Sequence, residues 1–241
     1  MAADYAAFRP TYPPAFFAAF ARRCAARNVV WDCGCGSGQA ALDLAAQFAR
    51  VEASDASGAQ LAQAVRHPRI RYRQAPAQAS GLGDTSVDGV LVAAAIHWFA
   101  GPDFSTEVRR VARPGAAMAW IGYLPLRLES AALQARLDRF YDADLAPWWP
   151  PQRQLVDRAY ADLEFPGREW PFPRELWIER HWDLAQLLGY LGTWSAVQAA
   201  REQGVEPLAE LGRELAGHWP QQGAAPLLVR WPFMGRWGRV G

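Results

Sequence analysis

A glycine-rich turn near the start of this chain constrains its fold more than any other segment. Three apolar residues lead to Asp32, and an apolar helical pattern begins at Gln39. The loop between them reads Gly34, Cys35, Gly36, Ser37 and Gly38. Because glycine has no Cβ atom, such a loop can turn sharply and approach a ligand closely. The pattern predicts a strand, a tight turn and a helix, with a ligand at the carboxyl end of the strand.

The acid before the loop distinguishes this turn from a dinucleotide site. The carboxylate of Asp32 would repel a pyrophosphate, but it suits a ligand that carries an ammonium or sulfonium charge. A second acid, Asp55, follows the glycines by about 20 residues, at the end of a predicted strand, where a nucleoside would present its ribose hydroxyls. The two acids and the loop together predict a nucleoside-type cofactor at one edge of a strand–helix–strand unit.

Strand-like and helix-like segments alternate through the first half of the chain. We predict strands over 29–32, 51–54, 70–74, 87–93 and 117–123, and helices over 14–26, 39–48, 59–65 and 104–111. This alternation predicts an α/β fold with a doubly wound, Rossmann-like, mostly parallel sheet. We expect seven strands in that sheet, with a C-terminal cap of helices and strands.

The composition changes after about residue 125, since nine of the 12 tryptophans lie from Trp148 onward. We predict helices over 130–145, 152–163 and 208–216, an extended edge strand over 168–182 and a last strand over 227–233. A capping box at Asp183 predicts a further helix that runs toward Ala200. We expect residues 1–125 to form the cofactor-binding core with an N-terminal lid. Residues 126–241 would supply a substrate cap and the outer strands of the same sheet.

The composition excludes several classes of function. All 25 basic residues are arginine, so a phosphate-loop lysine and a Schiff-base lysine are both ruled out. The net charge of +1 gives no strong attraction to nucleic acid or to an anionic membrane. Cys24, Cys33 and Cys35 lack metal-ligand spacing, and we predict no metal site. With no signal peptide and no apolar run of membrane-spanning length, we expect a cytoplasmic protein.

These motifs resemble those of the class I S-adenosylmethionine-dependent methyltransferases of methyltransferase-domain type 11. The glycine turn is similar to the first family signature, and Asp55 to the second. Residues 86–99 resemble the fourth signature of a small-molecule subgroup, the trans-aconitate methyltransferase-like proteins, in which a His-Trp pair follows the fourth strand. The lead-in Phe8–Pro14, the turn at 113–116 and residues 189–196 are also similar to this subgroup.

The resemblance implies S-adenosyl-L-methionine as the cofactor and assigns it a set of binding residues. These are Asp32, the loop and Asp55. Tyr12 of the lid has two interpretations: an aromatic wall against the sulfonium, whose positive charge favours a π-face, or a residue of the core. Segments after the second, third and fourth strands would complete the adenine and methionine walls through Ala56, Ala77, Gln78, Ala93 and Ala94.

Methyl transfer from a sulfonium is an in-line displacement in which the leaving group departs neutral. The protein therefore has to align the reactants and exclude water, and it needs neither a metal nor a catalytic triad. His97 has two interpretations: a general base or hydrogen-bond donor that orients the acceptor, or a ring that braces its loop beneath the lid.

Aromatic residues and one arginine are the candidates for the acceptor pocket. Aromatic walls with an arginine suit a small apolar or carboxylate-bearing molecule. The alternative is that these side chains only fill the core of the cap. The candidates are Trp98, Tyr123, Trp148, Trp149, Arg180 and Trp194. We expect a small-molecule acceptor, neither a nucleic-acid nor a membrane partner, and a monomer or homodimer.

Two other functions compete with this interpretation. The first is a protein that binds S-adenosylmethionine or S-adenosylhomocysteine without catalysing a reaction. The second is an NAD(P)-dependent oxidoreductase, which would favour Gly-x-Gly-x-x-Gly rather than the Gly-x-Gly-x-Gly present here. A catalytic tyrosine–lysine pair is impossible without lysine.

Overall fold

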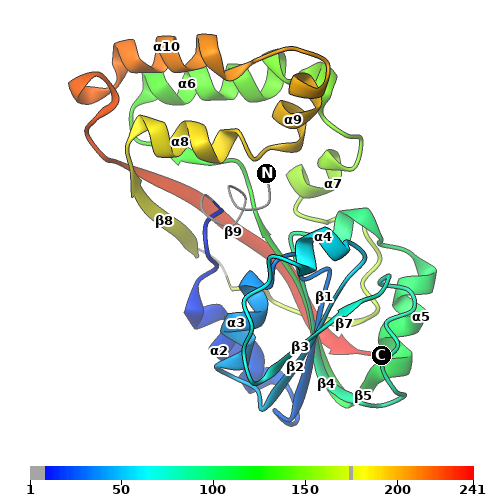
Figure 1. Cartoon of the computed structure of the whole chain (residues 1–241). Coiled ribbons are helices and arrows are strands. Elements are labelled where there is room, and N and C mark those ends of the chain that lie inside the picture. The colour runs from blue at the N-terminus through cyan, green and yellow to red at the C-terminus, as the bar shows by residue number, and fades with distance from the viewer. Residues whose placement is uncertain (1–8, 174–175) are drawn as a thin grey trace. The chain divides into compact units, whose positions relative to one another are not determined.

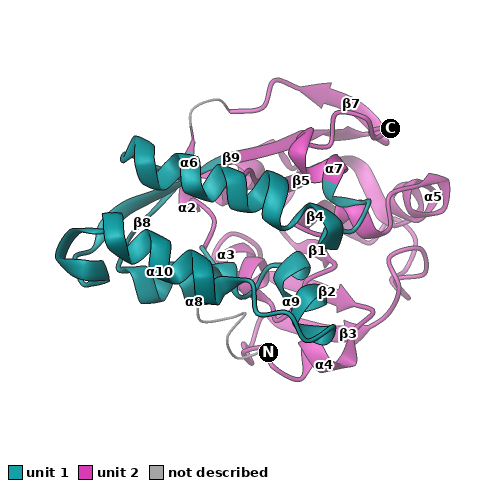
Figure 2. Ribbon diagram, turned by 90° about the horizontal axis from the view of Figure 1, so that it is seen from above, with its two compact units in different colours: residues 1–10, 125–153, 177–232 teal, residues 11–124, 154–176, 233–241 magenta. Residues whose placement is uncertain are grey.

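The computed structural model of the chain describes residues 9–173 and 176–241, which form two compact units (Figure 2). The sheet unit holds Thr11–Leu124, the described part of 154–176, and Phe233–Gly241. The helical unit holds residues 9–10, 125–153 and Trp177–Pro232. Both units are therefore assembled from separate stretches of the sequence.

The sheet unit is built on parallel strands in the order β3-β2-β1-β4-β5 (Figure 1). Their bounds are β1 (Val29–Cys33), β2 (Arg50–Asp55), β3 (Ile70–Gln74), β4 (Val87–Ala93) and β5 (Ala112–Tyr123). All five residues of β1 are buried, as expected for a central strand covered on both faces. The predicted α/β, Rossmann-like, mostly parallel sheet is confirmed.

Helices cover both faces of this sheet, with α2 (Pro14–Arg23) and α3 (Gln39–Ala45) on one side and α5 (Pro102–Val111) on the other (Figure 1). The short helix α4 (Gly58–Leu61) follows β2, and the 3₁₀ turn η1 (Ile96–Trp98) follows β4. In α2, Phe16, Phe17 and Phe20 form the buried face. This helix ends at Arg23 rather than at the predicted residue 26, because Cys24 has extended backbone that leads toward β1.

The last strand, β9 (Leu227–Val240), is twice as long as the predicted 227–233 and has pairing partners in both units. In the sheet unit it runs antiparallel to β5 and to β7 (Gly167–Trp170). In the helical unit it runs antiparallel to β6 (Arg127–Leu128) and to β8 (Trp177–Trp182). The described residues thus contribute nine strands, where we expected seven.

Two further predicted elements, one over 168–182 and one over 152–163, are wrong in extent. Residues 168–182 form β7 and β8 instead of one edge strand, because Pro171 and Pro173 between them have no N–H for a ladder bond. The helix expected over 152–163 is only α7 (Arg153–Asp157). Ala159 and Tyr160 follow it with φ of 50° and 62°, which a right-handed helix cannot contain.

The helical unit contains α6 (Ala131–Arg139), η2 (Phe140–Asp144), η3 (Ala146–Trp148), α8 (Leu184–Leu191), α9 (Ser195–Glu202), α10 (Leu208–His218) and η4 (Pro220–Gly223). The predicted capping box is confirmed: the Gln186 N–H donates to Asp183 Oδ1 over 2.8 Å, and the Asp183 N–H donates to Gln186 Oε1 over 3.1 Å. The helix does not run on to Ala200, because Trp194 is extended and a new helix starts at Ser195. Among the described residues, no helix combines the length and apolar character needed to span a membrane.

A buried carboxylate fixes the start of β1. Asp88, which is 3% exposed, accepts the N–H groups of Asn28 and Val29 through Oδ2 over 2.7 and 2.9 Å. Its Oδ1 pairs with Arg113 Nη1 over 2.8 Å. These bonds join the start of β1 to β4 and β5. They therefore help to position the strand that leads into the glycine turn.

We therefore expect Asp88→Asn to destabilise the protein by about 3 kcal/mol, because it removes the ion pair and leaves Arg113 without its carboxylate partner. Urea-induced unfolding measures the change. Asp142→Asn is the control, since that exposed side chain makes no comparable contact and should change stability by about 0.5 kcal/mol or less. Equal effects of the two substitutions would contradict this role for Asp88.

Candidate functional site

Asp32 is a buried acid with no hydrogen-bond partner. It is the fourth residue of β1, it is 0% exposed, and neither carboxylate oxygen is hydrogen-bonded among the described residues. Burial, together with the nearby charge of Asp55, raises the pKa of Asp32 to about 7. Burial also raises the pKa of Cys33 and of Cys35, so the neighbouring thiols stay neutral and add no further negative charge. An unpaired buried carboxylate is costly, and a cationic ligand would satisfy it.

The loop after Asp32 requires glycine for conformational and steric reasons. Gly34, Gly36 and Gly38 have φ of 69°, 55° and 84°, in the left-handed region that other residues rarely adopt. A Cβ at Gly34 would also lie 2.7 Å from Ala95 Cβ, so the loop packs directly against the segment after β4. A Cβ at Gly38 would collide with the Tyr72 hydroxyl. The loop thus packs closely against Tyr72 of β3 and against Ala95, which follows β4.

Three N–H groups of this loop are bonded to the end of β2. Those of Gly34 and Cys35 both donate to the Ser54 carbonyl, over 2.8 and 3.0 Å, and that of Gly36 donates to Asp55 Oδ2 over 2.8 Å. A phosphate-binding loop instead directs its N–H groups at the ligand. This arrangement, beside an unpaired acid, disfavours a pyrophosphate and therefore the NAD(P)-dependent alternative.

Asp55 anchors the loop and can still accept further hydrogen bonds. Its Oδ1 accepts the Ser57 N–H over 2.8 Å, and its side chain is only partly buried. A carboxylate has about four lone-pair sites, so two bonds to backbone leave room for hydroxyl donors. The predicted closeness of the two acids is confirmed: β1 and β2 pair in register, Asp32 opposite Ala53, so that both acids lie at the carboxyl end of the sheet.

The other predicted wall residues lie after neighbouring strands at the same edge. Ala77 is buried and Gln78 exposed in the turn after β3, and Ala56 is exposed after β2. The end of β3 is joined to β2, since the Ala75 N–H donates to the Asp55 carbonyl over 3.0 Å. Ala93 ends β4, and Ala94 follows it.

Ala94 holds a strained backbone conformation that no residue pattern predicts. Its φ is 50°, and its N–H donates to the Ile121 carbonyl of β5 over 2.8 Å. A left-handed alanine costs about 1–2 kcal/mol, and such strain is concentrated at functional sites. The turn at Ala94 directs the chain from β4 into η1, the element that carries His97.

His97 and Trp98 differ in their surroundings. The half-buried His97 ring stacks on Tyr160 with centroids 6.3 Å apart and planes inclined by 9°, and it lies 4.8 Å from the Trp98 ring. Trp98 is 57% exposed, which is unusual for so large an apolar side chain. Tyr160 is fully buried at a left-handed position, so it provides a fixed platform for the imidazole.

Tyr12 and Tyr123 are brought together in the sheet unit. Their ring centroids are 6.2 Å apart, and Phe233 lies 6.1 Å from Tyr12. Tyr12 is only 7% exposed, so packing accounts for much of its surface. Phe8 of the predicted lid motif lies outside the described residues.

The remaining acceptor candidates belong to the helical unit. Trp194 is 7% exposed and has its ring 5.6 Å from Trp149 and 5.5 Å from Tyr141. Trp148 is partly exposed on η3, and Arg180 on β8 donates to the Glu179 carbonyl over 2.7 Å. Trp194 thus lies in an aromatic cluster of that unit. Among the described residues, no group of three or more side chains could hold a metal ion.

Comparison with known proteins agrees with the geometry of this site. Residues 31–120, which include the glycine turn and both acids, match a family model described as "Methyltransferase domain". A solved structure from Anaeromyxobacter dehalogenans, titled a "Putative Type II Methyltransferase", is 46% identical with a TM-score of 0.88, and the match covers 97% of this chain and 98% of that one. The chain belongs to the S-adenosylmethionine-dependent methyltransferases.

A more distant relative agrees with this family assignment, and a further solved structure shares the fold. A Dictyostelium discoideum protein named a "Putative methyltransferase" is 29% identical over 199 residues, which cover 81% of this chain and 75% of that protein. The Bacillus subtilis YcgJ protein is 19% identical with a TM-score of 0.53, over 94% of this chain and 97% of its own, and it supports the fold alone.

S-adenosyl-L-methionine is the cofactor of this methyltransferase, and the residues present suit it. The molecule carries an ammonium and a sulfonium charge, which match the unpaired Asp32 carboxylate, and ribose hydroxyls, which match the remaining capacity of Asp55. Sequence reasoning did not identify the Ser54 carbonyl or Tyr160 as parts of the site, and it included Ala94 without predicting its left-handed backbone. Backbone acceptors and left-handed alanines leave no pattern in a sequence.

The raised pKa of Asp32 predicts how the cofactor-free methyltransferase responds to pH. The folded state keeps the proton up to about pH 7, whereas the unfolded chain releases it near 3.8. Stability conferred by Asp32 therefore falls as pH rises through this interval. Relative to Asp32→Asn, we expect the wild type to lose about 2–3 kcal/mol between about pH 5 and about pH 8 in urea unfolding. A difference that does not change with pH would contradict the burial of an unpaired acid.

Replacing Ala94 tests whether its backbone is strained. Ala94→Gly relieves the left-handed conformation, at the entropic cost of a glycine, so we expect stability to be unchanged or to rise by up to about 1 kcal/mol. The matched control is Ala93→Gly, one residue earlier in β4, which should lose about 1 kcal/mol in the same thermal unfolding measurement. Equal losses at the two positions would show that Ala94 is unstrained.

Proposed function

We propose that this methyltransferase transfers a methyl group to a small molecule from a donor held by Asp32 and Asp55. The observation that carries the proposal is the buried Asp32 carboxylate, which has no hydrogen-bond partner among the described residues. It lies beside a loop that directs three of its N–H groups to the end of β2. Such a site has unsatisfied acceptors and few free donors. It is therefore complementary to a ligand that is cationic and rich in hydroxyl groups.

The proposed donor site follows the carboxyl ends of β1 to β4. Asp32 would hold the cationic methionine portion, and Asp55 the ribose hydroxyls. The adenine would lie against Ala77 and Gln78 after β3, with Ala93 and Ala94 after β4 on the methionine side. Both charged contacts come from residues near the carboxyl ends of strands, where the sheet fixes the position of the backbone.

The proposed acceptor site includes His97. S-adenosylmethionine, when bound, supplies a methyl group that is already activated, so the chain has to align the nucleophile and exclude water. An acceptor that bears a proton on its nucleophilic atom would need a base, and the imidazole of His97 is held by the Tyr160 platform. We propose that His97 orients the acceptor and takes this proton, and that Trp98 and Tyr123 provide apolar walls.

The acceptor that fits this proposal is a small molecule, and a carboxylate group on it would suit the arginine-rich composition. The His97–Trp98 pair after β4 supports placing the chain with the trans-aconitate methyltransferase-like subgroup. Trp148, Trp194 and Arg180 remain proposed acceptor contacts from the helical unit. A cytoplasmic location and a monomeric or homodimeric state also remain predictions.

Calorimetry with S-adenosylhomocysteine, which keeps the ammonium and the ribose, tests the donor site. Because only ionised Asp32 attracts the cation, we expect affinity to fall by about tenfold for each pH unit below about 7. Asp32→Asn should weaken binding by about 30-fold or more, and Asp55→Asn by about tenfold. Asp103→Asn, at an exposed position on α5, is the control. Wild-type affinity in Asp32→Asn would refute the proposal.

His97→Gln tests the acceptor site, with a pool of small metabolites and a donor labelled in its methyl group. We expect unchanged affinity for S-adenosylhomocysteine and methyl incorporation lowered by about 100-fold or more. His218→Gln, the same substitution at an exposed position on α10, is the control and should leave methyl incorporation unchanged. Unchanged incorporation in His97→Gln, or loss of both binding and incorporation, would argue that the ring only braces η1.

A further inference from the structure

Two arginines face each other across β7 and β9 in the sheet unit. Arg168 and Arg239 are directly paired in the antiparallel register, so their side chains project from the same face. Both are exposed, and no carboxylate of the described residues pairs with either. Like charges directly opposite one another destabilise a sheet. A pair with no compensating acid therefore suggests a ligand that supplies the negative charge.

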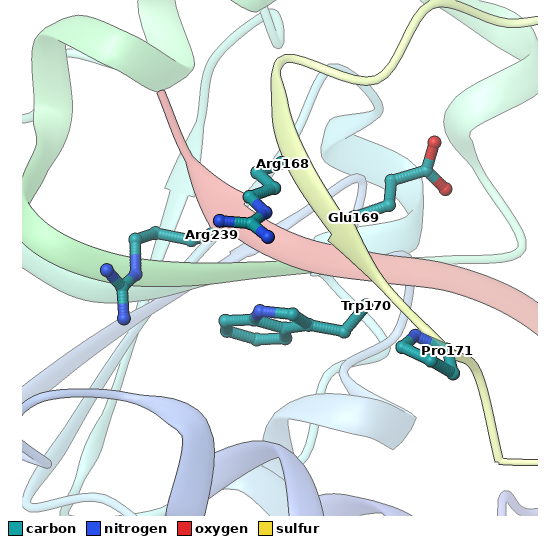
Figure 3. Close-up of a pocket in the computed structure, with 5 residues that line it drawn as sticks. All are labelled: Arg168, Glu169, Trp170, Pro171 and Arg239. Atoms are coloured by element: carbon teal, nitrogen blue, oxygen red, sulfur yellow. The ribbon is translucent and has the colours of Figure 1, made fainter.

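The groups around this pair are hydrogen-bond donors. Trp170 lies two residues after Arg168 on the same face of β7, and its indole N–H has no acceptor among the described residues. The guanidinium of Arg23 lies 5.2 Å from the centre of the Trp170 ring, which brings a third positive charge to this face. Figure 3 shows the guanidinium groups of Arg168 and Arg239 on the same side of β7 as the Trp170 indole.

Glu169, which lies between Arg168 and Trp170 on β7, is already engaged. The Glu169 carboxylate points away from the two arginines (Figure 3), and both of its oxygens accept from Arg236, over 2.5 and 2.9 Å. These bonds lower the pKa of Glu169, so it stays ionised and paired. It does not neutralise Arg168 or Arg239, and the face keeps its positive charge.

The paired arginines border a cavity of about 390 Å³. Its lining residues are Arg168, Glu169, Trp170, Pro171 and Arg239. Small-molecule sites have volumes of about 300–1,000 Å³ and combine apolar walls with a few polar groups. A cavity with an indole, a proline ring and two guanidinium groups meets this description for a small anion.

The cavity lies far from the proposed methyl-transfer edge. Arg239 pairs with Ala117, midway along β5, whereas Tyr123, at the carboxyl end of that strand, pairs with Phe233. Six residues of extended strand separate these positions by about 20 Å. A ligand in the cavity would therefore not be the methyl acceptor.

We propose that Arg168, Arg239 and the Trp170 indole N–H form a second site, which binds the oxyanion group of a small molecule. A phosphoryl group or a pair of carboxylates would present the same chemistry, since guanidinium groups bind both through paired hydrogen bonds. Charges on an edge strand also deter pairing with other chains. That role needs neither two arginines in register nor an indole donor beside them.

Thermal unfolding of the whole chain tests the site with inorganic pyrophosphate and, separately, with succinate. Sodium chloride at matched ionic strength provides the reference. We expect at least one of the two probes to raise the melting temperature by about 5 °C near saturation. The double substitution Arg168→Gln with Arg239→Gln should abolish the shift, and without a probe it should be at least as stable as the wild type.

Arg66→Gln with Arg109→Gln removes the same charge from exposed positions elsewhere and should keep the full shift. In ¹⁵N spectra, the indole resonance of Trp170, assigned by its absence in Trp170→Phe, should move on titration with the active probe. Shifts by pyrophosphate or by succinate would identify which oxyanion is preferred. The proposal is overturned if neither probe acts beyond sodium chloride, or if the Arg168/Arg239 double variant responds like the wild type.

Discussion

The end of β2 is the element on which the functional edge of this methyltransferase depends. The Ser54 carbonyl accepts two N–H groups of the glycine loop, and Asp55 accepts a third. These bonds hold the loop in its left-handed conformation whether or not a ligand is present. They also use the donors that would otherwise bind an anion, so the polarity of the site follows from how the loop is anchored.

The second feature on which the site depends is the burial of Asp32. Its burial is possible because β1 is the central strand, flanked by β2 and β4 and covered on both faces. The same burial leaves its carboxylate unsatisfied and raises its pKa to about 7. The free protein therefore stores an unfavourable interaction that a cationic ligand would relieve, which is a form of preorganisation.

Several elements of both units could be predicted because their signals are local. β3 and β4 have the predicted bounds, and the capping box at Asp183 is as expected, since alternation, apolar runs and cap residues act over a few positions. The second half was predicted less well. The length of β9 depends on partners distant in sequence, and α7 is ended by left-handed residues at Ala159 and Tyr160 that carry no glycine signature.

The same contrast applies to the site. Asp32, Asp55 and the glycines were identifiable because a carboxylate and a missing Cβ have chemical consequences at any position. Ala94 was predicted as a wall residue, but its left-handed backbone was not. The Ser54 carbonyl also acts through the backbone, and Tyr160 acts by stacking on His97 from 63 positions away in the sequence. Contacts of that kind depend on the completed fold, and composition or spacing does not reveal them.

The interleaving of the two units has a consequence for how this protein can vary. Each unit collects segments from both halves of the sequence, and β9 contributes strand residues to both. Neither unit is therefore encoded by a continuous stretch that could be exchanged between genes as a cassette. Changes in substrate preference within such a lineage would have to arise by substitution and loop insertion within one inseparable chain.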